Sequence, residues 1–300
     1  MRRRDVLAGG AALAIAAPAL AASDAPALGL DALVAWAALD LGSGRRLGHA
    51  PDRRMPMCSS FKWLLAAFVS WRTDRGLERL DRRIGFGPSD LLQASPTTTA
   101  ALAGRPHAEM TVAALAEAIT AVSDNAAANL LLRSVGGPGA LTAWLRGHGD
   151  AVTRCDRFEP TNNLVPLGDP RDTTTPIAAI ADLRRFLYGD ILSLASRERL
   201  MGWMLGCRVG EARLKAGLPT GWRIAHRTGT RDHDLTDGPH GPRGAVVDLG
   251  ALIPPAGAPI LVATYAAGFT CPLGEVEAWM AGVARQVVSS LRPQSLLRSP

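Results

Sequence analysis

Ser59 and Lys62 form the first pair of residues in the chain whose types and spacing could do covalent chemistry. They stand three positions apart in MPMCSSFKWLLAAFV (residues 55–69), where apolar residues recur at helical spacing. Side chains three positions apart on a helix share a face, so this hydroxyl and amine would lie side by side. At a helix start, unpaired backbone N–H groups and the positive end of the helix dipole could also stabilise an oxyanion formed at Ser59.

Lysine is rare in this sequence, which makes position 62 informative. Of the 33 basic residues only Lys62 and Lys215 are lysine, and the other 31 are arginine. Arginine keeps its proton in proteins, whereas a lysine with a lowered pKa can lose its proton and act as a base. A Ser-x-x-Lys pair also arises by chance, so the pair alone is weak evidence.

Two more short motifs follow in order. They are S-D-N, at Ser123, Asp124 and Asn125, and R-T-G, at Arg227, Thr228 and Gly229. We expect Ser123 to open a helix and R-T-G to lie inside a strand. Each motif alone fits a helix cap or a turn, but S-x-x-K, S-D-N and K-T-G occur in this order in class A β-lactamases and penicillin-binding proteins. The chain resembles this family at the first two motifs as written, and at the third with arginine in place of lysine.

The resemblance extends to a long polar loop, CDRFEPTNNLVPLGDPRDTTTP (residues 155–176). Class A enzymes carry Arg, x, Glu, Pro and then Asn in their active-site loop. The resemblance implies that Glu159 is the general base for the hydrolytic water, that Asn163 helps to hold this water, and that an ion pair of Arg157 and Asp172 closes the loop. A solvated loop carboxylate is the plain alternative for Glu159. Penicillin-binding proteins lack such a base.

The same resemblance implies an acyl-enzyme mechanism. Ser59 would attack the lactam carbonyl, with the oxyanion between the backbone N–H groups of Ser59 and Thr230. Ser123 would relay a proton to the leaving nitrogen, and either Lys62 or Glu159 would take the first proton. The residues expected to contact or orient the substrate are Asn125, Asn163, Arg213, Arg227, Thr228, Gly229 and Thr230, with Arg213 as a second cation for the substrate carboxylate.

Several positions depart from the family pattern. Arg227 replaces the usual lysine, but presenting positive charge to a carboxylate needs no proton loss. Ala94 stands where the family often has an aromatic gate. Some carbapenem-hydrolysing members join the cysteine before the nucleophile to a second cysteine after the third motif, whereas Arg231 stands there in this chain. We therefore expect no such disulfide, and a small buried thiol at Cys58. The family's first helix has almost no room before the first strand.

The strands and helices that we expect around these motifs indicate an α+β fold. Residues 32–51 read as two strands around a Gly-Ser-Gly turn, and strand-like segments return after residue 222, before a closing helix at residues 274–291. Amphipathic helical segments lie between. We expect an antiparallel five-stranded sheet from both chain ends, flanked by helices, with an all-helical subdomain inserted, as in β-lactamases and D-Ala-D-Ala peptidases.

The first residues read as an export signal. Residues 1–21 carry three arginines, an alanine-rich apolar run and a small-residue cleavage site, in the layout of a twin-arginine signal peptide. We expect its cleavage and a periplasmic or secreted location. The remaining chain divides into an α/β subdomain, residues 22–55 plus 206–300, and a helical subdomain, residues 56–205, with the active site between them.

Composition excludes several other classes of protein. The formal net charge of +6 is modest and scattered, with no basic block outside residues 1–21, so we expect no nucleic-acid partner. The six histidines are dispersed and the four cysteines show no metal-ligand spacing, so we expect neither a metal nor a cofactor. No stretch beyond the signal reads as a membrane anchor, and we expect a monomer whose partners are β-lactam antibiotics.

The main prediction is a periplasmic serine β-lactamase that confers antibiotic resistance. Three alternatives to it stay open. A D-Ala-D-Ala peptidase or penicillin-binding protein would acylate without fast deacylation. A penicillin-sensing receptor would do the same, but would need a membrane anchor and a signalling partner. A relative with impaired activity would fit the loss of the aromatic gate at Ala94.

The Lys62→Arg variant tests the interpretation of the rare lysine. Arginine keeps the positive charge but cannot release a proton, so we expect acylation by a penicillin to slow by about 100-fold or more. The measurement is the rate of acyl-enzyme formation, followed by rapid mixing. Acylation at the wild-type rate would show that proton transfer at position 62 is unnecessary.

Overall fold

The computed structural model describes residues 32–166, 168–231 and 244–292. The expected signal peptide and the region of the shortened first helix therefore lie outside the described residues. None of the helices in these ranges has the length and apolarity that a bilayer crossing requires.

Both ends of the chain contribute strands to one antiparallel sheet, which confirms the predicted fold class. Within the described ranges the sheet has five strands in the order β2-β1-β9-β8-β7. Strand β1 pairs with both β2 and β9, so the N-terminal hairpin is hydrogen-bonded to the C-terminal strands. The strands are β1 (Leu33–Asp40), β2 (Arg46–His49), β7 (Arg223–Arg231), β8 (Gly244–Ile253) and β9 (Ile260–Phe269).

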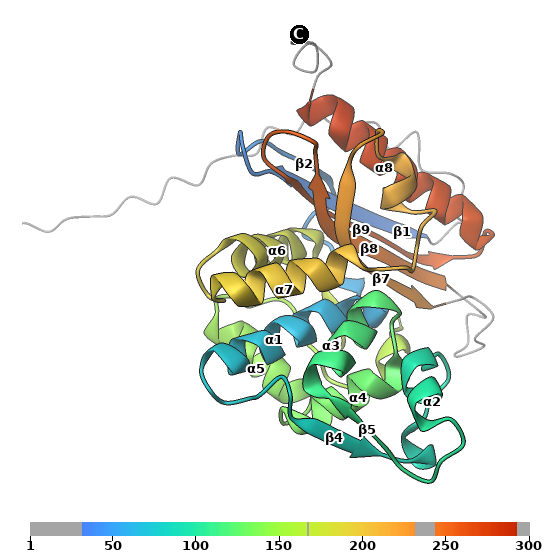
Figure 1. The fold of residues 1–300 in the computed structure, drawn as a ribbon. Helices are drawn as coiled ribbons and strands as arrows, with labels where there is room; N and C mark the ends of the chain where they lie inside the picture. The colour runs from blue at the N-terminus through green and yellow to red at the C-terminus, as the bar shows by residue number, and fades with distance from the viewer. Residues whose placement is uncertain (1–31, 167, 232–243, 293–300) are drawn as a thin grey trace, which may run out of the picture.

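The two faces of the sheet are covered by different helices. Trp36 and Ala38 point to the outer face, where the closing helix α8 (Leu273–Leu291) packs (Figure 1). Ala37 and Leu39 alternate with them and join the larger core on the inner face. Because both faces are covered, β9 is buried at every position and reads as a continuous apolar run.

Helix α1 (Lys62–Asp74) is the centre of the helical region. Every residue from Lys62 to Ser70 is buried, as in a helix enclosed on all sides. Stacked rings of Phe68 on Trp144, at 5.1 Å, and of Trp144 on Phe186, at 4.5 Å, connect α1 with α5 and α6. The other helices of this region are α2 (Pro96–Leu102), α3 (Val112–Ala121), α4 (Asn125–Ser134), α5 (Pro138–Gly147), α6 (Pro176–Tyr188) and α7 (Leu194–Leu205).

The inserted region is mainly, but not entirely, helical. Two short antiparallel pairs occur in it, β3 (Met55–Pro56) with β6 (Thr173–Thr174) and β4 (Arg83–Phe86) with β5 (Ala108–Thr111). The first pair fastens the end of the long polar loop to the segment before Ser59. Strands of two to four residues carry too little periodicity to be read from sequence.

Two helix starts in this region were predicted from the sequence. One prediction is confirmed and the other is wrong. Thr111 caps α3, as predicted, because its side chain accepts a hydrogen bond from the N–H of Ala114. The prediction that Ser123 opens α4 was wrong by one residue: Asp124 is the N-cap and accepts from the N–H of Ala127. Asp124 also accepts from the N–H groups of Thr97 and Thr98. This carboxylate thus joins α2 to α4 and leaves Ser123 outside the helix.

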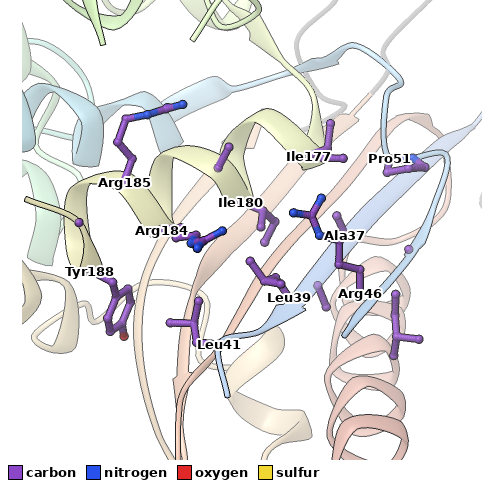
Figure 2. A pocket seen from close by; sticks show the side chains of 15 residues that line it. Ala37, Leu39, Leu41, Arg46, Pro51, Ile177, Ile180, Arg184, Arg185 and Tyr188 are labelled. Atoms are coloured by element: carbon purple, nitrogen blue, oxygen red, sulfur yellow. The ribbon is translucent and has the colours of Figure 1, made fainter. Parts of the chain in front are cut away.

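An open cavity lies at the edge of the sheet, away from the motif residues. It occupies ≈ 650 Å³ between β1, β2 and α6 (Figure 2). Gly48 pairs with Ala37 across the hairpin, and both residues line the cavity together with Ile180. Arg46 from β2 and Arg184 from α6 border the same space.

The Asp124→Ala variant tests the connection between α2 and α4. Removing the carboxylate deletes an N-cap and leaves buried N–H groups of Thr97 and Thr98 without an acceptor, so we expect the free energy of unfolding to fall by about 3 kcal/mol. Urea unfolding measures this change. The matched Asp81→Ala variant removes an exposed aspartate and should leave the midpoint unchanged. Equal midpoints for both variants would contradict the role of Asp124.

Candidate active site

Ser59 lies in a tight turn between β3 and α1. Residues Cys58–Phe61 form a 3₁₀ turn, and the α-helix begins at Lys62. Cys58 has a left-handed backbone with φ of 46°, which is unfavourable for a residue with a Cβ atom. Ser59 therefore stands at the helix entrance, where backbone N–H groups have no partner inside the helix.

The Lys62 ammonium brings three predicted site residues and Glu159 together. Its Nζ lies 3.0 Å from Ser59 Oγ, 3.2 Å from Ser123 Oγ and 2.5 Å from Asn125 Oδ1. It also donates to the backbone oxygen of Ser123 at 2.8 Å and forms an ion pair with Glu159 Oε1 at 3.0 Å. Residues separated by up to a hundred positions in sequence thus share one buried cation.

The environment of Lys62 favours loss of its proton. Burial lowers the pKa of Lys62 to about 8, although the Glu159 carboxylate partly opposes this shift, and nearby Arg227 lowers the pKa further. Burial alone would raise the pKa of Glu159, but the charge and hydrogen bond of Lys62 outweigh it and the pKa of Glu159 is lowered. The resting pair is thus a carboxylate and an ammonium whose proton is weakly held.

Glu159 is aimed at the nucleophile. Ser59 Oγ donates to Glu159 Oε1 at 3.1 Å, and Asn163 Nδ2 donates to Glu159 Oε2 at 2.6 Å. The side chain is almost completely buried. Glu159 is therefore not the solvated loop carboxylate of the alternative interpretation.

Asn129 holds the backbone of Glu159 and was missed in the sequence. Its Oδ1 accepts from the N–H of Glu159, and its Nδ2 donates to the carbonyl oxygen of Glu159, both at 2.9 Å. These two bonds tie the loop to helix α4. The sequence feature that could have identified Asn129 is its place as a polar residue on the buried face of the helical segment NAAANLLL. A buried amide there needs hydrogen-bond partners.

The long loop is closed by the ion pair that the resemblance implied. Arg157 Nε lies 2.6 Å from Asp172 Oδ2, and Arg157 Nη1 donates to the carbonyl oxygen of Leu164. Asp172 also accepts from the backbone N–H groups of Asp156 and Arg157. These contacts join the two ends of the loop.

Ser123 and Asn125 reach the site from the segment before α4. Ser123 has φ of 65°, a left-handed conformation that turns its carbonyl oxygen and hydroxyl toward Lys62. Asn125 bridges Lys62 and the carbonyl oxygen of Gln93, and its own N–H donates to the carbonyl oxygen of Ala94. Ala94 therefore borders the site, at the place where the family often carries an aromatic ring.

Strand β7 brings the third motif against the Ser59 turn. A Cβ atom on Gly229 would lie 2.6 Å from the carbonyl oxygen of Met57 and 2.9 Å from Cys58 Cβ, so only glycine permits this approach. Thr230 follows Gly229 directly on β7, so it is the next residue after the one that contacts this turn. The backbone N–H groups of Ser59 and Thr230 thus belong to two adjoining segments, as an oxyanion site needs.

The two arginines of the predicted carboxylate site differ in their surroundings. Arg227 is fully buried, and its Nη1 donates to Thr228 Oγ1 at 3.2 Å. Arg213 is paired with Glu277 at 3.1 Å and donates to Thr230 Oγ1 at 2.7 Å. Arg213 therefore supports Thr230 from behind, instead of offering a second unpaired cation.

The four cysteines are not joined in disulfides. The structure records Cys58, Cys155, Cys207 and Cys271 as free thiols. Cys58 is buried, as predicted, and burial raises its pKa to about 12. In the described ranges no group of three or more His, Cys, Asp or Glu side chains is arranged to hold a metal ion.

The Gly229→Ala variant tests the close approach of β7. The added methyl group would push the strand from the Ser59 turn, and a displacement of about 1 Å would lower kcat/KM by about 100-fold. The matched Gly139→Ala variant adds a methyl group in open space on α5 and should keep wild-type kinetics. Steady-state hydrolysis of a penicillin measures both. Equal kinetics in the two variants would contradict the steric requirement at Gly229.

Comparisons with known proteins agree with this geometry. A model described as the β-lactamase enzyme family matches residues 29–291. The chain is 45% identical to β-lactamase L2 of Stenotrophomonas maltophilia over 76% of this chain and 71% of that protein. It is 36% identical to β-lactamase AST-1 of Nocardia asteroides over 85% of this chain and 77% of that protein.

Two solved structures give the same result. An ancestral class A β-lactamase (GNCA) is 48% identical, with a TM-score of 0.78 over 86% of this chain and 94% of that chain. A β-lactamase from Xanthomonas campestris is 41% identical, with a TM-score of 0.79 over 86% of this chain and 91% of that chain. The chain therefore belongs to the class A β-lactamase family.

Proposed function

We propose that this enzyme hydrolyses the lactam amide of penicillins through an acyl-enzyme on Ser59 and so confers resistance to them. One observation carries the proposal: a buried glutamate, Glu159, lies 3.1 Å from the Ser59 hydroxyl and is held there by Asn163. This arrangement provides a base at the position where an ester on Ser59 must be hydrolysed.

Acylation uses the proton network around Lys62. Ser59 Oγ attacks the lactam carbonyl carbon, and its proton passes to Glu159 or to the deprotonated form of Lys62, both within hydrogen-bonding distance. The backbone N–H groups of Ser59 and Thr230 stabilise the oxyanion. The carbon–nitrogen bond then breaks, and Ser123, next to Lys62, delivers a proton to the leaving nitrogen.

Deacylation uses Glu159 as the base. Glu159 accepts a proton from a water molecule, whose oxygen attacks the ester carbon of the acyl-enzyme. The ester bond breaks, and the proton taken up by Glu159 passes to Ser59 Oγ, which restores both groups. The lowered pKa of Glu159 keeps the carboxylate ionised, and Lys62 is the main source of that shift against the opposing effect of burial. Asn163 and Asn129 hold the side chain and the backbone of this base.

The substrate class follows from the cation beside the nucleophile. Penicillins carry a carboxylate next to the lactam ring, and Arg227 with Thr228 offers a guanidinium and a hydroxyl to such a group. Thr230 matches the residue that class A members with broad cephalosporin action carry at this position. Cephalosporins are therefore the second candidate class of substrate. Export directed by residues 1–21, followed by their removal, would bring the enzyme to the periplasm or outside the cell, where these drugs act on the cell wall.

A penicillin-binding or penicillin-sensing protein is the second candidate function. It shares the nucleophile, the lysine and the oxyanion site but stops at the acyl-enzyme. The position of Glu159 favours the hydrolase. Intact-protein mass with benzylpenicillin, followed over time beside the absorbance of the lactam ring, separates the two. Many turnovers with return to the free mass are expected, and a stable adduct without turnover would overturn the hydrolase.

The Glu159→Ala variant isolates the deacylation step. Without the base, hydrolysis of the acyl-enzyme should slow by about 1,000-fold, within the range for loss of general base catalysis. A mass increase of one penicillin should persist after mixing. The control Ser59→Ala should fold normally and form no adduct. Turnover by Glu159→Ala at the wild-type rate would remove Glu159 from the mechanism.

A further inference from the structure

The open cavity between β1, β2 and α6 takes no part in the proposed reaction. None of the 15 residues that line it belongs to the three motifs or to the loop that carries Glu159. Its volume of ≈ 650 Å³ lies within the range of about 300–1,000 Å³ that is common for small-molecule sites. The cavity is therefore large enough to hold a ligand of its own.

One stripe of helix α6 forms a wall of this cavity. The residues of the stripe are Ile177, Ile180, Ala181, Arg184, Arg185 and Tyr188. They recur three and four positions apart, which is the spacing of a single helix face. The stripe runs from Ile177 to Tyr188 and is therefore roughly 16 Å long. An extended ligand matches such a wall better than a compact one.

The opposite wall is the β1–β2 hairpin, and most of it is apolar. Leu39 and Leu41 come from the end of β1 and the turn after it, and Leu47 and Pro51 come from β2 and the turn that follows. The N–H of Ile177 donates to the carbonyl oxygen of Pro51 at 3.0 Å, which joins the two walls at one end. The site is thus formed in advance, and a ligand that enters it has little protein to order.

The charged residues at the cavity are arginines from both walls. Arg46 stands on β2, Arg184 and Arg185 stand on α6, and no described aspartate or glutamate lines the space. Arg185 is paired with Asp182 on its own helix. The side chains of Arg46 and Arg184 form no ion pair or hydrogen bond with any described residue. Figure 2 shows Ile180 between these two arginines, so both cations border one apolar space.

We propose that this cavity binds a fatty-acid anion, which is a carboxylate with an extended alkyl chain. The carboxylate accepts hydrogen bonds from Arg46 and Arg184, because guanidinium groups bind carboxylates through charge-assisted hydrogen bonds. The alkyl chain lies along Leu39 and Ile180, where burial of its methylene groups supplies most of the affinity. This site is separate from Ser59, and the inference does not depend on the proposed function.

Other occupants would use fewer of these features. A neutral apolar molecule would contact the walls but leave both guanidinium groups without an anion, and a cationic molecule would be repelled by them. A second copy of this chain could instead pair with β2, which is an edge strand of the sheet. Each alternative predicts a different binding result.

The first experiment measures binding of decanoate to the purified enzyme by isothermal titration calorimetry, below the concentration at which decanoate forms micelles. We expect one site per chain. Decanol, which lacks the charge, and decyltrimethylammonium, which reverses it, should bind at least tenfold more weakly. In the series hexanoate, octanoate and decanoate, each added methylene should lower the Kd by about threefold. No saturable binding of decanoate, or equal binding of decanol, would overturn the proposal.

Arginine variants test where the carboxylate binds. Arg46→Ala and Arg184→Ala should each raise the Kd for decanoate by about fivefold, because each removes a charge-assisted contact at an exposed position. The matched Arg223→Ala variant removes an exposed arginine from β7, at the other edge of the sheet, and should bind decanoate normally. Equal affinity in the three variants would mean that Arg46 and Arg184 do not hold the ligand.

The Ala181→Trp variant fills the cavity from α6. Ala181 is exposed and lines the space, so the added ring should enter it while the fold is kept. We expect binding of decanoate to be lost, with an unchanged midpoint of thermal unfolding and unchanged acylation by benzylpenicillin. Decanoate binding that survives in this variant would overturn the site. Sedimentation should show a monomer, and a wild-type dimer that Ala181→Trp dissociates would mean that a second copy covers this face instead.

Discussion

The buried contact between Lys62 and Glu159 is the interaction on which the site depends. Each group would be unfavourable alone in this interior, and each makes the other tolerable. The ammonium keeps the carboxylate ionised as a base, while burial holds the lysine close to losing its proton. Ser59 lies within hydrogen-bonding distance of both groups, so Glu159, or Lys62 in its deprotonated form, can accept its proton. The same pair thus serves both halves of the proposed reaction.

The scaffold places the two charges at the right separation. Lys62 cannot move away, because helix α1 is buried between the sheet and the other helices. Glu159 belongs to a long loop, but its backbone is held by Asn129 and the ends of the loop are joined by Arg157 and Asp172. A loop can therefore present a catalytic base as rigidly as a helix does, provided that buried polar groups fix it.

Strand β7 connects this ion pair with the substrate side of the site. Gly229 lets the strand contact the Ser59 turn, and Arg227 lies close enough to lower the pKa of Lys62. An arginine in place of the family's usual lysine keeps the charge but adds a larger guanidinium with more donors to satisfy.

Local features that depend on short spacings along the chain could be predicted from the amino-acid sequence. Ser59 and Lys62 share a face because they are one helical turn apart, and Thr111 caps a helix because its side chain reaches the nearby N–H of Ala114. The strands of the main sheet were also readable, since buried strands carry long β-branched and apolar runs. Tertiary structure alone decided which distant groups meet. It assigned Asn129 to Glu159 and buried Arg213 against Glu277. No local spacing encodes these contacts, because they arise only when the packing of apolar faces brings separate elements together and leaves their buried polar groups to pair with one another.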